Sequence, residues 1–384
     1  MKEKVSKKFQ EIYGSGAILF ASPGRINLIG EHTDYNGGFV FPGAVDKGIV
    51  AAIKLNGTDK VRAYALDLGE SAEFGLNEAD KPAQSWACYI FGVCREIQKR
   101  GGKIGGFDTV FAGDVPLGAG MSSSAALEST YAFALNDLYN CGIDKFELAK
   151  IGQSTEHNYC GVNCGIMDQF ASSLGKKDNA ILLNCKTLEY EYIPLELGNY
   201  SLVIANCNKP RSLQDSKYNE RRAETEEALE KLKTVIPSAA CLADISPAQF
   251  NEFGKKVLSG KVYDRAKHVI EECARVLSSA EALKKGEIEK FGEYLNQSHY
   301  SLRDLYEVTG DYLDALSARS REFDGCIGSR MTGAGFGGCT VSLVEKDKVD
   351  EFIKYVDEKY YADMGVRAAF YKTSIENGAQ EIKE

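Results

Sequence analysis

The stretch Gly113-Asp-Val-Pro-Leu-Gly-Ala-Gly-Met-Ser-Ser-Ser-Ala-Ala-Leu-Glu128 joins two regular elements. The run 106–112 before it is rich in β-branched and aromatic residues and predicts a strand. The run 122–140 after it spaces its apolar residues as a helix does. Glycines in the turn let the backbone fold closely around a ligand, and the free N–H groups of a helix N-terminus attract an anion. We therefore interpret the stretch as a phosphate-binding loop, with these candidate residues: Pro116, Gly118, Gly120, Ser122, Ser123 and Ser124.

The loop differs from the two commonest phosphate motifs. A P-loop would end in Gly-Lys-Ser/Thr, and a dinucleotide fingerprint would place a third glycine where Ser123 stands. From these residues alone, an ordinary strand-to-helix turn capped by serine is the alternative interpretation.

The whole chain has the composition of a globular protein. Its 384 residues, 44% of them hydrophobic, predict two or three domains with well-filled cores. The formal net charge of −9 argues against a nucleic acid or an anionic membrane as the main partner. An anionic substrate must then be bound by local positive charge.

Cysteine usage predicts a reducing compartment. The chain has eleven cysteines, an odd number, and its first nine residues are too charged for a secretory segment, so we expect reduced thiols in the cytoplasm. No apolar run is long enough to span a bilayer. One cluster, His157, Cys160 and Cys164, lacks a clear fourth ligand, and we expect no zinc there.

Periodicity predicts an α+β chain with a domain boundary near residue 195, which gives an N-terminal domain 1–195 and a C-terminal domain 196–384. Besides 106–112, the predicted strands are 17–20, 48–53, 180–183, 201–205, 339–344 and 367–372. Besides 122–140, the predicted helices are 85–100, 145–160, 220–235, 262–277, 287–306 and 348–361.

The segment 22–38 between the first two predicted strands is crowded with charged and titratable side chains, among them Arg25, Glu31, His32 and Asp34. Such groups suit a buried strand end only if they pair or meet a ligand. The alternative is a solvated turn with a hairpin tip at Asn36-Gly37.

Three segments, taken together, resemble one family of kinases. Gly-Arg-Ile-Asn-Leu-Ile-Gly-Glu-His-Thr-Asp-Tyr at 24–35 resembles the galactokinase signature at every position. Segment 116–126 resembles the nucleotide motif of the wider family of galactokinases, homoserine kinases, mevalonate kinases and phosphomevalonate kinases, and 332–338 resembles its third motif. Segments 164–169 and 216–222 match as well. The resemblance implies the family's two-domain α+β small-molecule kinase fold, with the active site in the cleft between the domains.

The resemblance also implies a reaction. A galactokinase transfers the γ-phosphate of ATP to the anomeric hydroxyl of D-galactose and produces galactose 1-phosphate and ADP, the first committed step of galactose use. Asp168 then matches the catalytic base, and Arg25 the cation that keeps this base ionised. Considered alone, Asp168 could be a helix N-cap and Arg25 a surface ion-pair partner.

The remaining site residues are implied in the same way. Sugar recognition is expected from Glu31, His32, Asp34, Gly165 and Tyr218. Mg²⁺ is expected on Glu156 with Ser123 or Ser124, because this ion takes few protein oxygens. Trp86 is expected near the adenine of ATP, with a core anchor as the alternative. Gly43 stands in a segment that more often reads Pro-Met-Ala, and we expect it close to the sugar pocket.

Two other functions compete with this one. One is a kinase of the same fold for N-acetylgalactosamine or arabinose. The other is a non-catalytic sensor that binds sugar and ATP. Such relatives carry a deletion in the phosphate-binding loop around Ser122, Ser123 and Ser124, here called the serine loop, whereas Ser124-Ala125 is present in this chain. We therefore expect a monomeric enzyme that acts on D-galactose and ATP, with no nucleic-acid or membrane partner.

Overall fold

The computed structural model describes residues 1–116, 120–209 and 215–383. Within these residues the strands form three sheets, with the orders β13-β1-β3-β6-β4-β5, β10-β11-β9-β12 and β2-β7-β8. The strands are β1 (Ile18–Asn27), β2 (Phe39–Val40), β3 (Pro42–Leu55), β4 (Lys60–Ala65), β5 (Glu70–Gly75), β6 (Phe107–Gly113), β7 (Asn179–Asn184), β8 (Tyr190–Pro194), β9 (Tyr200–Asn206), β10 (Cys326–Thr332), β11 (Cys339–Glu345), β12 (Ala369–Thr373) and β13 (Gln380–Glu381).

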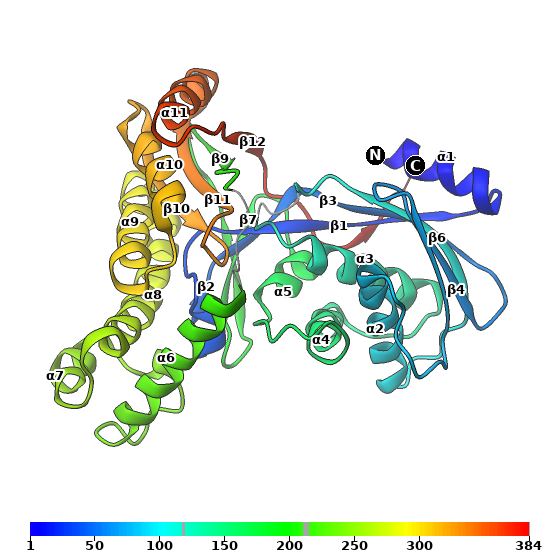
Figure 1. The fold of residues 1–384 in the computed structure, drawn as a ribbon, viewed down its shortest axis with the longest axis horizontal. Helices are drawn as coiled ribbons and strands as arrows, with labels where there is room; N and C mark the ends of the chain where they lie inside the picture. The colour runs from blue at the N-terminus through cyan, green and yellow to red at the C-terminus, as the bar shows by residue number, and fades with distance from the viewer. Residues whose placement is uncertain (117–119, 210–214, 384) are drawn as a thin grey trace.

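The helices cover these sheets in two groups (Figure 1). They are α1 (Lys2–Tyr13), α2 (Ser85–Lys99), α3 (Ser123–Leu138), α4 (Lys145–Thr155), α5 (Met167–Leu174), α6 (Asp215–Lys233), α7 (Pro247–Val257), α8 (Gly260–Lys284), α9 (Ile288–Ser301), α10 (Gly310–Glu322) and α11 (Val349–Met364). In the described part of the chain, no helix has the length and apolar character needed to cross a membrane.

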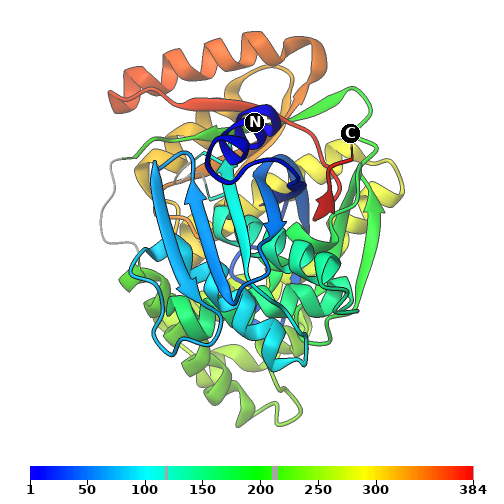
Figure 2. The same ribbon diagram turned by 90° about the vertical axis from the view of Figure 1, so that its right-hand side faces the viewer.

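The largest sheet lies between α1 on one face and α2 to α5 on the other (Figures 1 and 2). Side chains of a strand alternate between the two faces, so on β3 Ala51 and Ile53 join the core with α2 and α3, while Ala52 packs with Val5 and Phe9 of α1. Strand β13 pairs with β1, and both chain ends therefore lie near this sheet.

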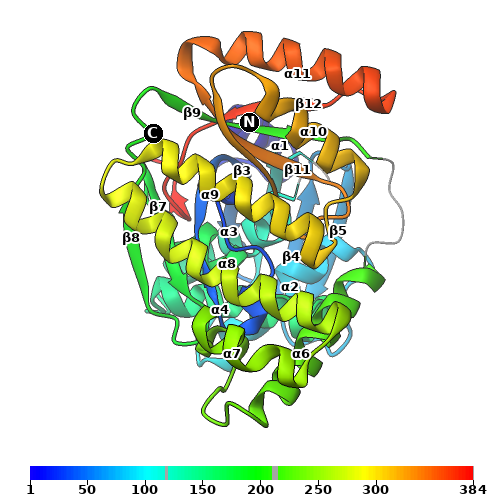
Figure 3. The same cartoon turned by 90° about the vertical axis from the view of Figure 1, so that its left-hand side faces the viewer.

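The second half of the chain, from β9 onward, is built on the four-stranded sheet. Helices α9, α10 and α11 contact this sheet, α9 and α10 both through β10, while α8 lies beside α9 (Figure 3) and contacts β2, β7 and β8 of the three-stranded sheet. A separate apolar cluster joins the two halves, with Ile26 and Phe41 from the first half and Ile204, Phe291 and Val341 from the second. The domain boundary near residue 195 stays a prediction.

Most predicted elements are present, with shifts of a few residues at their ends. Two predicted helices stop early, because α4 and α9 are each followed by a π-helical turn, Glu156–Cys160 and Leu302–Tyr306. The alternative interpretation of 22–38 as a solvated turn is excluded, because β1 runs through Asn27 and no residue of 22–38 is exposed. The elements that were not predicted include α1, α5, α7, α10, β8 and the β4–β5 hairpin.

Candidate active site

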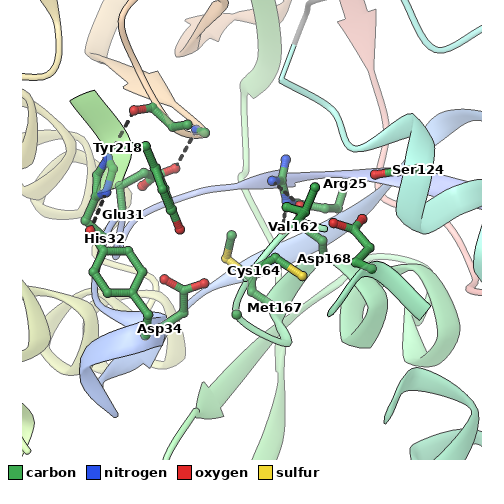
Figure 4. A pocket seen from close by; sticks show the side chains of 15 residues that line it. Arg25, Glu31, His32, Asp34, Ser124, Val162, Cys164, Met167, Asp168 and Tyr218 are labelled. Carbon is green, nitrogen blue, oxygen red and sulfur yellow. Dashed lines mark hydrogen bonds and ion pairs between the residues drawn. The ribbon is translucent and has the colours of Figure 1, made fainter. Parts of the chain in front are cut away.

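A cavity of about 210 Å³ lies where β1, α5 and the second half of the chain meet. Figure 4 shows Arg25, Ser124 and Asp168 toward one end of it and Glu31, His32 and Tyr218 toward the other. The predicted site residues that line the cavity are Arg25, Glu31, His32, Asp34, Ser124, Glu156, Gly165, Asp168 and Tyr218. The structure thus brings together residues from both halves that are up to about 190 positions apart in the chain.

Strand β1 carries Arg25 into the site and also holds the serine loop. The pairing of β1 with β3 shifts register between Pro23 and Arg25. The backbone N–H of Arg25 donates to the Met121 carbonyl oxygen at 3.1 Å. A Cβ on Gly24 would lie only 2.4 Å from that same carbonyl oxygen, so the close approach of strand and loop requires glycine.

Asp168 is held by two hydrogen bonds from one guanidinium. Arg25 Nε donates to Oδ1 and Nη2 to Oδ2, both at 2.7 Å. Ser122 Oγ also donates to Oδ2. Asp168 is not an N-cap, because α5 begins at Met167 and Ile166 occupies the cap position. Arg25 is likewise buried rather than a surface residue, so both alternative interpretations are excluded.

The serine loop differs in detail from the prediction. Ser122 precedes α3 with φ 53°, makes no capping hydrogen bond and instead uses its hydroxyl on Asp168. Gly120 has φ 67°, and its carbonyl accepts from Arg25 Nη1. Gly118 lies outside the described residues. Pro116 is half-buried at the end of a described segment.

Glu156 lies beside Ser124 at the same end of the cavity. Burial raises the pKa of the Glu156 carboxyl, and a hydrogen bond from Ser124 opposes this effect. Ser123 is exposed and does not line the cavity. One hydroxyl and one carboxylate fit Mg²⁺, which takes few protein oxygens and completes its shell with phosphate and water. Ser124 and Glu156 are therefore the residues that could bind this ion.

In the cluster His157, Cys160 and Cys164, where the sequence predicts no zinc, the histidine has a protein partner. His157 Nε2 lies 2.9 Å from the Cys164 carbonyl oxygen. Over the described ranges of the chain, no group of three or more His, Cys, Asp or Glu side chains is arranged to hold a metal ion. A metal at Ser124 and Glu156 would consequently depend on ligands brought by the substrate.

Glu31 is almost entirely engaged by protein donors. Its Oε1 accepts from the Gly333 N–H at 2.9 Å, and its Oε2 accepts from Arg330. Thr332 Oγ1 lies 3.2 Å from Oε1 and shares its one proton between this oxygen and the Asn27 carbonyl oxygen at 2.9 Å. Burial raises the pKa of the Glu31 carboxyl, and the Arg330 charge opposes this effect. A carboxylate accepts about four hydrogen bonds, so Glu31 retains about one acceptor position for a ligand.

Both ring nitrogens of His32 have protein partners. Nε2 lies 3.1 Å from the Ala334 carbonyl oxygen, which only accepts, so Nε2 carries the proton. Nδ1 then accepts from the Tyr35 hydroxyl at 2.8 Å. Burial lowers the pKa of His32 to about 3, which keeps the ring neutral. The ring packs against Tyr218 with 5.7 Å between the centroids.

Asp34 and Gly165 are in close contact. A Cβ on Gly165 would lie 2.0 Å from Asp34 Oδ2, so any other residue there would displace this carboxylate. Burial and, next, the neighbouring charge of Asp168 raise the pKa of Asp34 to about 6. Asp34 thus connects the two ends of the cavity electrostatically.

Trp86 and Gly43, which were expected from the sequence near the adenine and the sugar, do not line the cavity. Trp86 is buried in the core beside Phe111, and its Nε1 donates to Glu70 Oε2 at 2.8 Å. Gly43 is buried on β3, where a Cβ would lie 2.6 Å from Ile375 Cδ1, and it is not among the residues that line the cavity. The role of Trp86 in ATP binding stays a prediction.

Several residues that contact the sugar signature by hydrogen bonds were not identified from the sequence. Arg330 contacts Glu31, and His268 Nε2 lies 3.2 Å from the Glu31 carbonyl oxygen. Tyr306 pairs with Tyr35, with 2.9 Å between the hydroxyl oxygens. For Arg330 a signal existed: it stands in a short apolar strand pattern directly before the third motif, where a charge needs a partner.

Known proteins resemble this chain in sequence and in fold. The family models that match are the galactokinase galactose-binding signature over residues 7–55, the GHMP kinases N terminal domain over 88–176 and the GHMP kinases C terminal domain over 279–362. The crystal structure of Lactococcus lactis galactokinase complexed with galactose matches with a TM-score of 0.94 and 42% identity over 98% of both chains. Mevalonate kinase matches with a TM-score of 0.65 at 21% identity over 94% of this chain and all of that chain, a likeness of fold alone.

Curated relatives match over the full length. The galactokinase of Fusobacterium nucleatum is 47% identical over 100% of both chains, and that of Clostridium tetani is 45% identical over 99% of this chain and 97% of the relative. Fold and site together define a small-molecule kinase of the GHMP class, as the sequence predicts. Within that class, the chain belongs to the galactokinase family. It is an enzyme, a sugar kinase with ATP as co-substrate.

Proposed function

We propose that this enzyme transfers the γ-phosphate of ATP to the anomeric hydroxyl of D-galactose. The observation that carries the proposal is a single cavity with an ion-paired carboxylate, Asp168, at one end and the sugar signature at the other. The related enzyme of Lactococcus lactis, similar over 98% of both chains, is described as a complex with galactose.

In the proposed mechanism Asp168 accepts the proton of the sugar hydroxyl. The hydroxyl oxygen then forms a bond to the γ-phosphorus of ATP, the bond to the β–γ bridging oxygen breaks, and ADP leaves. Arg25 supports the step twice, because its charge keeps Asp168 ionised and offsets negative charge on the transferred group. Ser122 orients the carboxylate by its hydrogen bond to Oδ2.

ATP is proposed to bind at the serine loop, with its phosphates against the N-terminus of α3 and its adenine near Trp86. Ser124 and Glu156 would hold Mg²⁺, which neutralises phosphate charge when bound. Pro116, Gly118, Gly120, Ser122 and Ser123 would supply the loop around the phosphates.

The sugar is proposed to lie between Asp34, Glu31, His32 and Tyr218. Asp34 and the remaining acceptor position of Glu31 would accept hydrogen bonds from sugar hydroxyls, with the backbone of Gly165 beside them. His32 would contribute its ring rather than a ring nitrogen, because both nitrogens already have partners. An epimer that leaves Asp34 or Glu31 unpaired would be rejected for this reason.

The test is an ADP-release assay with D-galactose, D-glucose, N-acetylgalactosamine and L-arabinose, and phosphorus NMR of the product. We expect D-galactose to have the highest kcat/KM, D-glucose a far lower one, and the phosphate to be on the anomeric oxygen. Equal kcat/KM for galactose and glucose would refute the proposal, as would a phosphate on another hydroxyl. A higher kcat/KM for N-acetylgalactosamine or arabinose would establish the related-sugar alternative.

We also propose that the enzyme is a cytoplasmic monomer. All eleven cysteines are free thiols in the structure, which is typical of a reducing compartment. Size-exclusion chromatography with light scattering would test the oligomeric state, and a mass near 84 kDa instead of 42.0 kDa would contradict it.

A further inference from the structure

Arg330 is a fully buried charge near the sugar signature. It stands on β10 with none of its side chain exposed. Its Nη1 donates to the carbonyl oxygens of Leu28 at 3.1 Å and Asn27 at 3.2 Å, and its Nη2 donates to Glu31 Oε2. Its Nε donates to Ser298 Oγ at 3.2 Å. Every nitrogen of the guanidinium is therefore used, and three of the four acceptors belong to residues 27–31.

A second buried carboxylate, that of Glu272, extends this hydrogen-bond network and also contacts the segment 27–31. Glu272 of α8 accepts from the Gly30 N–H at 3.1 Å and from Arg275 Nε at 2.7 Å. Ser298 Oγ donates to Glu272 as well, so one hydroxyl connects the Arg330 and Glu272 groups. Together, Arg330 and Glu272 contact polar groups of 27–31 at four residues, Asn27, Leu28, Gly30 and Glu31.

Stability alone does not account for such a network. Taking charges out of water costs several kcal/mol per ion, and apolar replacements of buried ion pairs are often neutral or stabilising. Apolar side chains could not, however, satisfy the carbonyl groups of Asn27 and Leu28, nor could they fix the orientation of Glu31. The network thus provides an arrangement of residues 27–31 that an apolar core could not provide.

We propose that Arg330 is a positioning residue of the sugar site, which aims the remaining acceptor position of Glu31 at a sugar hydroxyl. The inference rests on the proposed function, because Glu31 is there a sugar ligand. Arg330 itself does not line the cavity and acts through Glu31 and the backbone of 27–31. Its contribution concerns sugar affinity and the choice between epimers, whereas the phosphate end of the cavity does not depend on it.

Lysine cannot replace this arginine. A guanidinium presents donors in a planar fork and reaches acceptors in several directions at once, whereas an ammonium group is a compact point charge on a flexible stem. Arg330→Lys retains the charge and should allow folding, but it leaves at least one of the two backbone carbonyls or Glu31 without its partner. We expect KM for galactose to rise by about 10- to 100-fold, kcat to stay within threefold and KM for ATP within twofold.

The matched control is Arg265→Lys. Arg265 is also buried, with 1% of its side chain exposed, and it pairs with Glu224, Glu307 and the Leu305 carbonyl but with no group of residues 27–31. We expect this control to lower Tm about as much as Arg330→Lys does, with KM for galactose unchanged. Equal KM effects in the two variants, or a lowered Tm with unchanged KM in Arg330→Lys, would overturn the proposal.

A double-mutant cycle tests whether Arg330 acts through Glu31. The KM effects of Arg330→Lys and Glu31→Gln should be clearly less than multiplicative when combined, because both changes remove the same sugar contact. Independent effects would refute a common route. If Arg330→Lys does not fold, Ser298→Ala removes the acceptor of Arg330 Nε together with the bridge to Glu272 and should raise KM for galactose two- to fivefold. An unchanged KM would then refute the proposal.

The two proposals fail separately. If the wild-type enzyme prefers another sugar, the proposed function fails, yet Arg330→Lys should still raise KM for that preferred sugar. If galactose is the preferred substrate and Arg330→Lys leaves its KM unchanged, only the inference fails.

Discussion

Two carboxylate–arginine pairs lie at opposite ends of the same cavity, and they differ in how open they are. In the Arg25–Asp168 pair, 27% of the Asp168 side chain is exposed, whereas in the Arg330–Glu31 pair the side chains are 0% and 2% exposed. A group that exchanges a proton needs room for the reacting atoms, while a group that only recognises a ligand benefits from being fixed. Exposure to the cavity thus separates the proposed chemical end from the proposed recognition end.

The largest effect is expected from Asp168→Asn. The amide is nearly isosteric but cannot accept the hydroxyl proton, so kcat should fall by about 10²- to 10⁴-fold, the usual range for a general base. Affinities for ATP and galactose should stay within about tenfold, because the charge matters mainly as the proton moves. A steady-state assay with a melting curve tests this. A folded variant that turns over within threefold of wild type would show that the base is elsewhere.

A smaller effect is expected from Asp34→Asn, which changes the carboxylate between the two pairs. Because the amide has fewer acceptor positions, KM for galactose should rise about 10- to 100-fold at pH 7.5 while kcat falls less. In the wild type, KM should also rise as the pH falls through about 6, where Asp34 becomes protonated, and the asparagine variant should lack this dependence. A pH series of KM measures both. Matching pH profiles in the two proteins would exclude Asp34 from sugar binding.

Asp34→Asn should increase the stability of the fold, although it weakens sugar binding. The folded pKa of about 6 lies above the ordinary value of 3.8, so the contribution of this carboxyl to stability is present below pH 3.8 and lost as the pH rises through about 6. At pH 7.5 the charged side chain therefore destabilises the fold, and Asp34→Asn should raise Tm. A lower Tm at that pH would contradict the assigned environment.

The next effect concerns the metal. Glu156→Gln should raise the Mg²⁺ concentration for half-maximal activity about tenfold, because the amide binds the ion more weakly than a carboxylate. Ser124→Ala should act in the same direction. Ser123→Ala is the control, since this side chain is exposed and does not line the cavity, and its Mg²⁺ titration should match wild type. An unchanged titration for Glu156→Gln would remove this residue from the metal site.

The smallest effect is expected at Trp86, which contacts neither ion pair. If it lies near the adenine, Trp86→Phe should raise KM for ATP about two- to fivefold and leave KM for galactose unchanged. If it is only a core anchor, the variant should lower Tm through the lost contact with Phe111 and the lost hydrogen bond to Glu70, with KM for ATP unchanged. Kinetics at varied ATP together with a melting curve distinguish these outcomes.

The sequence predicted the elements that depend on local pattern. The strand before the serine loop, the helix after it and the strands around 48–53 and 201–205 have side-chain periods that any short window shows. The long charged helices of the second half were predicted for the same reason. The β4–β5 hairpin and α1 were missed because their patterns are weak, and their place is decided by packing against the large sheet.

The sequence by itself determined which chemistry the chain can carry, because the galactokinase signature, the serine loop and Asp168 are local motifs of fixed residue types. Only the tertiary structure decided how these groups are charged and aimed. Glu31 and Arg330 are 299 residues apart, and nothing in either neighbourhood shows that these two residues form a pair. The pKa of Asp34 depends in the same way on burial and on Asp168, which belongs to another element. Such partners follow from chain topology and packing, and these are properties of the whole fold rather than of any segment.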